Sequence, residues 1–237
     1  MLPVGPVGDP SSPARQTPAV TRSVDAVIFD LGGVLARNGR PSDVASRYPG
    51  HDPLTIIELL MGDYAADTDH PWHRLERGEI TLAENRELNR AALRSVGIEM
   101  PPVPAPSTGS GAGGFAFELN APMIELVVEL RAAEPRLKLG VLTNNVREFR
   151  PIWWEMLPFE EWFDDVVDSH EVGLRKPNAA IYELALRRLD VPAERAAFLD
   201  DVATNVTPAN ALGMHGVLVE DDPSAAIAEV RRLVGLD

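Results

Sequence analysis

The segment Val27-Ile28-Phe29-Asp30-Leu31-Gly32-Gly33-Val34-Leu35 decides how the fold of this chain is interpreted. The apolar residues 24–29 are typical of a strand in the interior of a sheet. Asp30 ends this run, and Gly32-Gly33 directly after it indicates a tight turn. We therefore expect the carboxylate of Asp30 to lie at the end of a buried strand.

Other apolar runs end in polar residues in the same way. They cover 137–142, before Thr143-Asn144-Asn145; 196–199, before Asp200-Asp201; and 216–219, before Glu220-Asp221-Asp222. We predict a weaker strand over 165–168, and amphipathic helices over 123–133, 178–189, 203–212 and 224–234. Alternating strands and helices predict an α/β fold with a parallel sheet and right-handed crossovers. Ligands bind beyond the carboxyl ends of such strands, so we expect the polar residues there to converge.

The interval from Asp30 to Thr143 is far longer than the roughly 30 residues of a βαβ unit. It contains helical patterns over 54–61 and 82–96, followed by a Pro/Gly/Ser-rich stretch whose composition is that of a flexible linker. We interpret this interval as a small helical insert over the strand ends. The predicted division is a flexible tail over 1–22, a core over 23–40 and 119–237, and a helical insert with its linker over 41–118.

Composition and charge restrict the classes of function. The chain has 237 residues, of which 45% are hydrophobic, and this is enough to bury a sizeable core. Its net charge of -14 argues against nucleic acid or an anionic membrane as a partner. The absence of cysteine excludes disulfides and thiolate catalysis. Neither a bilayer-spanning run of about 18 apolar residues nor a signal peptide is recognisable, and we expect a cytoplasmic protein.

Four elements at the expected strand ends fit one reaction: Asp30, Thr143, Lys176 and the pair Asp200-Asp201. A carboxylate can attack phosphorus and divide hydrolysis into two easier steps. A magnesium ion held by carboxylates, together with a lysine, can neutralise the phosphate charge. Each element alone has an ordinary explanation as a turn residue, a helix cap or a surface lysine. Their order and their shared position at strand ends favour the joint interpretation.

These motifs resemble those of the haloacid dehalogenase-like (HAD) hydrolase superfamily. They are especially similar to the N-terminal phosphatase domain of soluble epoxide hydrolases. The matching segments are 27–35, 141–145, 171–177 with Ile181-Tyr182, 198–201 with Asn205 and 211–214, and the insert segment 75–81. The resemblance implies a Rossmann-like core with an inserted α-helical cap, and a small phosphorylated substrate.

The resemblance also implies roles for individual residues. Asp30 would be the nucleophile, and Lys176 would bridge this carboxylate and the phosphate. Thr143 would bind the phosphate together with the backbone of Asn144. These three side chains, Asp30, Thr143 and Lys176, form the implied catalytic set.

The cofactor implied by the resemblance is Mg²⁺. Its ligands would be Asp30, the backbone carbonyl of Gly32, and Asp201. Asp200 would bind the ion directly or through a water molecule. Asn205 either supports this metal site through a hydrogen bond or simply lies in a helix.

Gly32 departs from the pattern of most phosphatases in this superfamily, which have a general-acid aspartate at that position. Such acid–base help is typically worth about 10²- to 10⁴-fold in rate. One interpretation is a substrate with a good leaving group, such as an acyl phosphate or a sugar 1-phosphate. A second is a slow enzyme or a protein that mainly binds a phosphorylated ligand. A third is a 2-haloacid dehalogenase, which the paired aspartates at 200–201 make the least favoured.

Three other features receive ordinary structural interpretations. We expect His73 to be a solvated or packing residue, and Trp153-Trp154 to form the core and surface of a helix. The acidic residues 220–222 are expected in a loop near a helix N-terminus, where negative charge is favoured.

Overall fold

The structure of the protein, a computed structural model, describes residues 22–37, 41–102, 118–133 and 135–236. The predicted flexible tail therefore lies outside the described residues except for Arg22. Most of the predicted linker lies outside them as well. No helix in the described part of the chain is both long and apolar enough to cross a bilayer.

A five-stranded parallel sheet with the order β5-β4-β1-β6-β7 forms the centre of the fold. Its strands are β1 (Ala26–Phe29), β4 (Lys138–Thr143), β5 (Asp165–Asp168), β6 (Ala196–Asp200) and β7 (His215–Leu218). In this sheet Phe29 is in register with Val141 and Leu199. The predicted α/β fold with a parallel sheet is confirmed. Asp30 directly after β1, and Thr143 and Asp200 as the last residues of β4 and β6, lie at the carboxyl end of this sheet.

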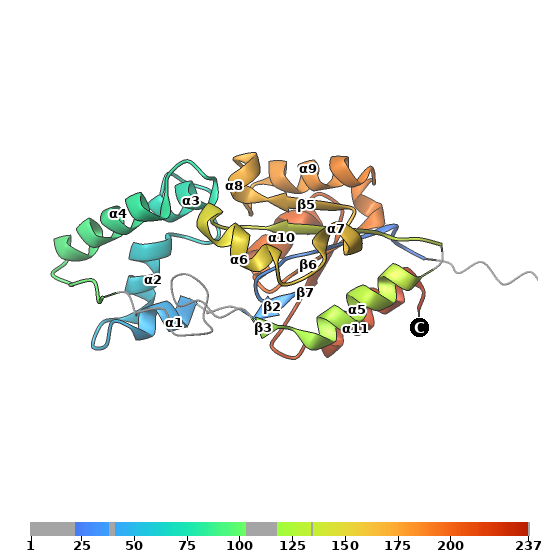
Figure 1. The fold of residues 1–237 in the computed structure, drawn as a ribbon, viewed down its shortest axis with the longest axis horizontal. Coiled ribbons are helices and arrows are strands. Elements are labelled where there is room, and N and C mark those ends of the chain that lie inside the picture. The colour runs from blue at the N-terminus through green and yellow to red at the C-terminus, as the bar shows by residue number, and fades with distance from the viewer. Residues whose placement is uncertain (1–21, 38–40, 103–117, 134, 237) are drawn as a thin grey trace, which may run out of the picture.

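Helices cover both faces of this sheet because both faces of β1 are apolar. Val27 and Phe29 pack in one core with residues of α5 (Ala121–Ala132) and α11 (Ser224–Val234). Ala26 and Ile28 point the other way and pack with α9 (Ala179–Leu189) and α10 (Ala203–Ala211). The alternation of side chains along a strand therefore divides one short apolar run between two helical layers, and Figure 1 shows α9 on one side of the strands and α5 with α11 on the other.

The larger core contains an aromatic group from the segment after β4. Trp153, in α6 (Arg150–Trp154), is fully buried and packs edge-on against Phe159 of α7 (Phe159–Trp162). Trp154 is partly buried, and its ring stacks on Phe159 at 4.9 Å between centroids. The guanidinium of Arg150 lies over the Trp154 ring, 4.0 Å from its centroid. The expectation that Trp153-Trp154 serves packing is confirmed.

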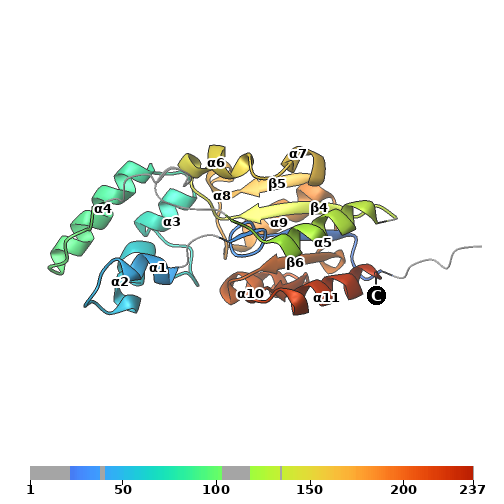
Figure 2. The ribbon, with the colours of Figure 1, turned by 60° about the horizontal axis from the view of Figure 1, so that its bottom comes forward.

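Four helices of the insert lie beyond one end of the sheet (Figures 1 and 2). They are α1 (Pro41–Ser46), α2 (Pro53–Met61), α3 (Pro71–Glu76) and α4 (Leu82–Ser95), and a small core that includes Ile56, Leu60 and Leu93 joins them. The helix predicted over 82–96 begins at a capping box in which Thr81 and Glu84 satisfy each other's backbone N–H groups. The boundaries of the cap at 41 and 118 stay a prediction.

Several short elements were not predicted. Besides α1, α3 and α7, they are β2 (Ala36–Arg37), β3 (Glu118–Leu119), η1 (Arg147–Phe149), α8 (Ser169–Val172) and η2 (Ala193–Arg195). β2 and β3 pair antiparallel where the chain leaves and re-enters the core. Elements of two to six residues are too short to show a hydrophobic period, so a single sequence carries no signal for them.

Candidate active site

A buried lysine joins two carboxylates at the edge of the sheet. Lys176 Nζ lies 2.9 Å from Asp30 Oδ1 and donates to Asp200 Oδ2 at 2.6 Å. Lys176 is 1% exposed and Asp200 is fully buried, so these charges are removed from bulk water. In a medium of low polarity, such pairs are much stronger than they would be on the surface.

The backbone of Lys176 is held by the strand end that carries Thr143. Asn144, directly after β4, accepts from Lys176 N–H at 2.8 Å and donates to the Lys176 carbonyl at 2.9 Å. This reciprocal pair fixes the loop after α8 against the end of β4. Thr143 is 2% exposed and lies beside Asn144 at the same edge.

Three carboxylates form a cluster that could hold a metal ion. Asp30, Asp200 and Asp201 each offer an oxygen, and these oxygens lie within 4.8 Å of one another. Asn205 Nδ2 donates to Asp200 at 3.1 Å and orients this carboxylate. Gly33 makes room for Asp201, because a Cβ at position 33 would lie 2.1 Å from Asp201 Cγ. Gly33 also has a φ of 76°, in the left-handed region that favours glycine.

The electrostatics of the cluster favour a further cation. Burial raises the pKa of the Asp30 carboxyl to about 8, and the nearby Asp200 and Asp201 carboxylates add to this rise, whereas Lys176 opposes it. Burial acts to lower the pKa of Lys176, but the charges of Asp200 and Asp30 outweigh it and the pKa is raised. One ammonium therefore does not neutralise the three acids. A set of carboxylate oxygens with excess negative charge fits Mg²⁺.

A cavity of about 1220 Å³ opens over this cluster. Its floor includes Asp30, Thr143, Lys176 and Asp201 from the core. The insert contributes polar, aromatic and apolar residues to the opposite walls, including Tyr48, Leu60, Met61, Tyr64, Trp72, Glu76, Asn85 and Asn89. The volume leaves room for an organic group well beyond a single phosphate.

A model of the haloacid dehalogenase-like hydrolase family matches residues 24–213. The chain belongs to this family. It is 33% identical over 236 residues to acyl-CoA dehydrogenase family member 10 of Mus musculus, with 97% of this chain covered. It is 26% identical over 224 residues to bifunctional epoxide hydrolase 2 of Mus musculus, with 87% of this chain covered. The expected resemblance to epoxide hydrolases is confirmed.

The chain spans only 21% and 38% of the lengths of these two relatives. By contrast, it spans 96% of sesquiterpene phosphatase astK of Aspergillus oryzae, at 26% identity and with 89% of this chain covered. The relatives of this HAD hydrolase therefore include a phosphatase of matching length.

Solved structures of HAD enzymes share the fold. One, described as a predicted HAD-like family hydrolase from Porphyromonas gingivalis, has a TM-score of 0.62 at 24% identity and covers 89% of this chain and 98% of its own. A HAD family enzyme of Bacteroides thetaiotaomicron, in complex with magnesium and inorganic phosphate, has a TM-score of 0.59 at 18% identity, with 84% and 96% covered.

In this HAD hydrolase the predicted site residues lie around one cavity. Its lining includes Asp30, Gly32, Thr143, Asn144, Lys176, Asp201 and Asn205, and Asp200 lies beneath it in contact with Lys176 and Asn205. His73 is fully buried, and its Nδ1 accepts from Thr68 N–H at 3.1 Å, so it is a packing residue. The roles of the site residues stay predictions.

Some residues of this region were not predicted as part of the site. Glu220 and Asp221, interpreted as ordinary loop charges, line the cavity. Glu76 also lines it and forms a buried ion pair with Arg175 at 2.7 Å. These two residues are separated by 99 positions, and no pattern in a single sequence indicates that they pair.

Proposed function

We propose that this HAD hydrolase is a magnesium-dependent phosphatase that acts on a small phosphorylated metabolite, with Asp30 as the nucleophile. The observation that supports this most strongly is the position of Lys176 Nζ, 2.9 Å from Asp30 and 2.6 Å from Asp200. An ammonium at this point can bind phosphate oxygens, and it favours the charged form of the nearby Asp30 carboxylate against the effect of burial. The neighbouring cavity is large enough for the organic part of a substrate.

Asp30 would attack phosphorus and form an aspartyl phosphate while the bond from phosphorus to the leaving oxygen breaks. Oδ1 of Asp30 contacts Lys176 and accepts from Leu31 N–H at 2.7 Å, so we assign the attack to Oδ2. Water would then hydrolyse the acyl phosphate and release inorganic phosphate and the Asp30 carboxylate. Thr143 and the backbone of Asn144 would hold the phosphate oxygens through both steps.

Asp30, Asp201 and the backbone carbonyl of Gly32 would hold Mg²⁺, and Asp200 would support the ion directly or through water. When bound, the ion supplies positive charge to the phosphate oxygens and so lowers the cost of bringing an anion to a carboxylate. Lys176 supplies the remaining positive charge. Asn205 keeps Asp200 in orientation through its two contacts of 3.1 and 3.2 Å.

Gly32 limits the substrates that this site can hydrolyse. In the first step the leaving oxygen takes the electron pair of the broken bond, and glycine has no proton to give it. Leaving groups that are stable as anions need no such proton, so an acyl phosphate or sugar 1-phosphate fits best. The same observation supports a second candidate, a protein of low turnover that mainly binds a phosphorylated ligand.

An assay of three proteins separates these functions. Wild type, Asp30→Asn and Gly32→Asp are tested on p-nitrophenyl phosphate and acetyl phosphate, with and without Mg²⁺. The phosphatase proposal expects turnover that needs Mg²⁺ and that Asp30→Asn abolishes. It also expects Gly32→Asp to raise the rate most for the poorer leaving group.

Two other results would replace the proposal. Binding of a phosphorylated ligand without turnover on a broad phosphate panel would favour the binding protein. Metal-independent halide release from a 2-haloacid would favour a dehalogenase.

A further inference from the structure

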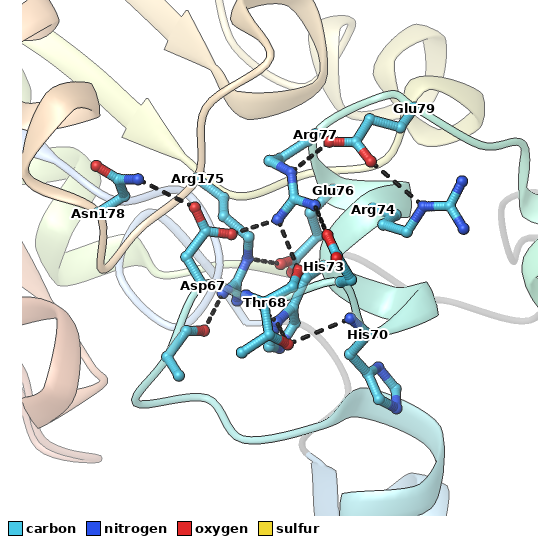
Figure 3. A network of polar contacts seen from close by, with 12 residues as sticks. Asp67, Thr68, His70, His73, Arg74, Glu76, Arg77, Glu79, Arg175 and Asn178 are labelled. Atoms are coloured by element: carbon cyan, nitrogen blue, oxygen red, sulfur yellow. Dashed lines mark hydrogen bonds and ion pairs between the residues drawn. The ribbon is translucent and has the colours of Figure 1, made fainter.

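A buried ion pair joins the insert to the loop that carries Lys176. Arg175 is fully buried, and its Nε donates to Glu76 Oε2 at 2.7 Å (Figure 3). Arg175 Nη1 donates to the carbonyl of Ala66 at 2.6 Å, so this side chain binds two segments of the insert. The peptide unit after Arg175 leads directly to the Lys176 ammonium at the centre of the site.

Glu76 is held from several sides. Its Oε1 accepts from Trp72 Nε1 at 2.9 Å, and its backbone carbonyl accepts from Ser169 Oγ at 2.6 Å. Ser169 in turn accepts from Asn145 N–H at 2.9 Å, at the end of β4. Trp72 and Glu76 also line the cavity, so the Glu76 carboxylate that binds Arg175 lies in the cavity wall.

A second contact fastens the same loop on its other side. Asn178 Nδ2 donates to Asp67 Oδ2 at 3.1 Å, and Asp67 also pairs with Arg77 (Figure 3). Lys176 therefore lies between two residues, Arg175 and Asn178, that both bind the insert. The loop cannot shift without breaking contacts to the insert, and a buried charge left without its partner is strongly unfavourable.

We infer that Glu76 and Arg175 are positioning residues, which hold Lys176 against Asp30 and Asp200 and couple this arrangement to the insert that covers the cavity. Arg175 is joined to Lys176 by the peptide bond, and Glu76 acts through its ion pair with Arg175, so neither side chain takes part in bond making. Glu76 therefore has two roles in this inference: it holds Lys176 in position through Arg175, and it forms part of the cavity wall. The kinetic test of this inference measures phosphate-ester hydrolysis and therefore rests on the proposed phosphatase function.

The kinetic test uses Glu76→Gln in the full chain, because this change keeps the shape of the side chain and removes its charge. A displacement of about 1 Å at a reacting group can cost about 10²-fold in rate, so we expect kcat for p-nitrophenyl phosphate to fall about 10- to 100-fold. KM should rise by a smaller factor than kcat falls, because the displaced lysine loses part of its contact with phosphate while the cavity wall that holds the organic group keeps its shape. Glu76→Asp, which keeps the charge, should restore part of kcat. An unchanged kcat in Glu76→Gln overturns the inference.

A matched control removes a contact between insert and core that lies outside this loop. Glu148 Oε1 accepts from Leu82 N–H at 2.8 Å, and Glu148→Ala abolishes this bond. We expect its kcat to stay within about twofold of wild type, as for most surface changes. If Glu148→Ala lowers kcat as much as Glu76→Gln does, any loosening of the insert suffices and the specific role of Glu76 is refuted.

A double-variant cycle tests whether Glu76 acts through Lys176. Calorimetry measures the affinity for inorganic phosphate in the presence of Mg²⁺, for wild type, Glu76→Gln, Lys176→Met and the double variant. Residues that act as one unit give non-additive effects, so Glu76→Gln should weaken binding in wild type but change it less than about twofold beside Lys176→Met. Equal losses in both backgrounds overturn the inference.

A readout independent of activity separates the failure of this inference from that of the proposed function. A crystal structure of Glu76→Gln should show Lys176 Nζ displaced from Asp30 or Asp200. If both contacts are retained at their present distances, the pair does not position the lysine, whatever reaction the enzyme performs. If wild type hydrolyses no phosphate ester but the displacement occurs, the phosphatase proposal fails and the positioning role stands.

Discussion

Replacing Gly33 with alanine should damage the carboxylate cluster through one added methyl group. The new Cβ would lie 2.1 Å from both Cγ and Oδ2 of Asp201, far inside the contact distance of non-bonded atoms. Ordinary carbon contacts are about 3.5–4.0 Å, so Asp201 must move by more than about 1 Å. The positive φ of 76° adds backbone strain of roughly 1–2 kcal/mol for any residue other than glycine.

The expected result is a loss of metal affinity that exceeds the loss of stability. Disturbing the groups that orient metal ligands typically costs about 10- to 100-fold in affinity or activity, and we expect Gly33→Ala to weaken Mg²⁺ binding by at least this factor. Calorimetric titration with Mg²⁺ measures the affinity, and urea denaturation measures the free energy of unfolding.

Gly50→Ala is the matched control for backbone strain. Gly50 has a φ of 86°, but a Cβ there would meet nothing within 4 Å. It should lose a similar amount of stability through strain and keep its Mg²⁺ affinity. The reasoning is refuted if Gly33→Ala binds Mg²⁺ as tightly as wild type, or if Gly50→Ala loses affinity to the same extent.

Three further predictions concern stability, each measured by urea denaturation. Thr81→Ala should lower the free energy of unfolding by about 1 kcal/mol, because it removes the N-cap of α4; an unchanged value would contradict the capping role. Tyr182→Phe should cost about 1 kcal/mol, because the buried hydroxyl donates to the Asn205 carbonyl at 2.8 Å; equal stability would contradict this. Burial, aided by the charge of Arg175, lowers the pKa of His73 from 6.5 to about 4. The unfolded chain therefore binds this proton first, and wild type should lose up to about 3 kcal/mol as the pH falls from 6.5 to 4. His73→Asn should reduce that loss, and an identical pH dependence in both proteins would refute it.

The sheet and its main helices were predictable because their periods are strong. The strand predicted over 165–168 and the helix over 224–234 match β5 and α11 at both ends. Asp30 was placed correctly at a strand end because β1 is buried on both faces of the sheet. Its residues are therefore continuously apolar, and the first polar residue after them marks the end of the strand. The order β5-β4-β1-β6-β7 was beyond prediction, since apolar runs do not say which strand neighbours which.

The site was predictable only in the part that the sheet assembles. Asp30 follows β1, Thr143 and Asp200 are the last residues of β4 and β6, and parallel register alone brings these three residues together. The contacts of Glu76 with Arg175 depend on how a separate group of helices lies over the sheet, and no local pattern specifies that arrangement. The resemblance to a family identified the segment 75–81 but did not indicate that Glu76 within it binds Arg175.

Charge balance connects these parts of the molecule. With Asp30 ionised, the carboxylates of Asp30, Asp200 and Asp201 would bring three negative charges to the cluster and Lys176 one positive charge, so two negative charges would remain. Burial and this excess of negative charge raise the pKa of Asp30 to about 8. Arg175 does not change this balance, because its charge is matched by that of Glu76. A divalent ion would neutralise the remainder, whereas a monovalent ion would leave the cluster negative. In a chain of net charge -14, a phosphate group can approach this floor only if the local charge is first cancelled. In the proposed arrangement, the buried pair of Glu76 and Arg175 would position Lys176 without adding net charge to the site. The divalent ion proposed to bind the carboxylates would supply the charge that attracts the anion.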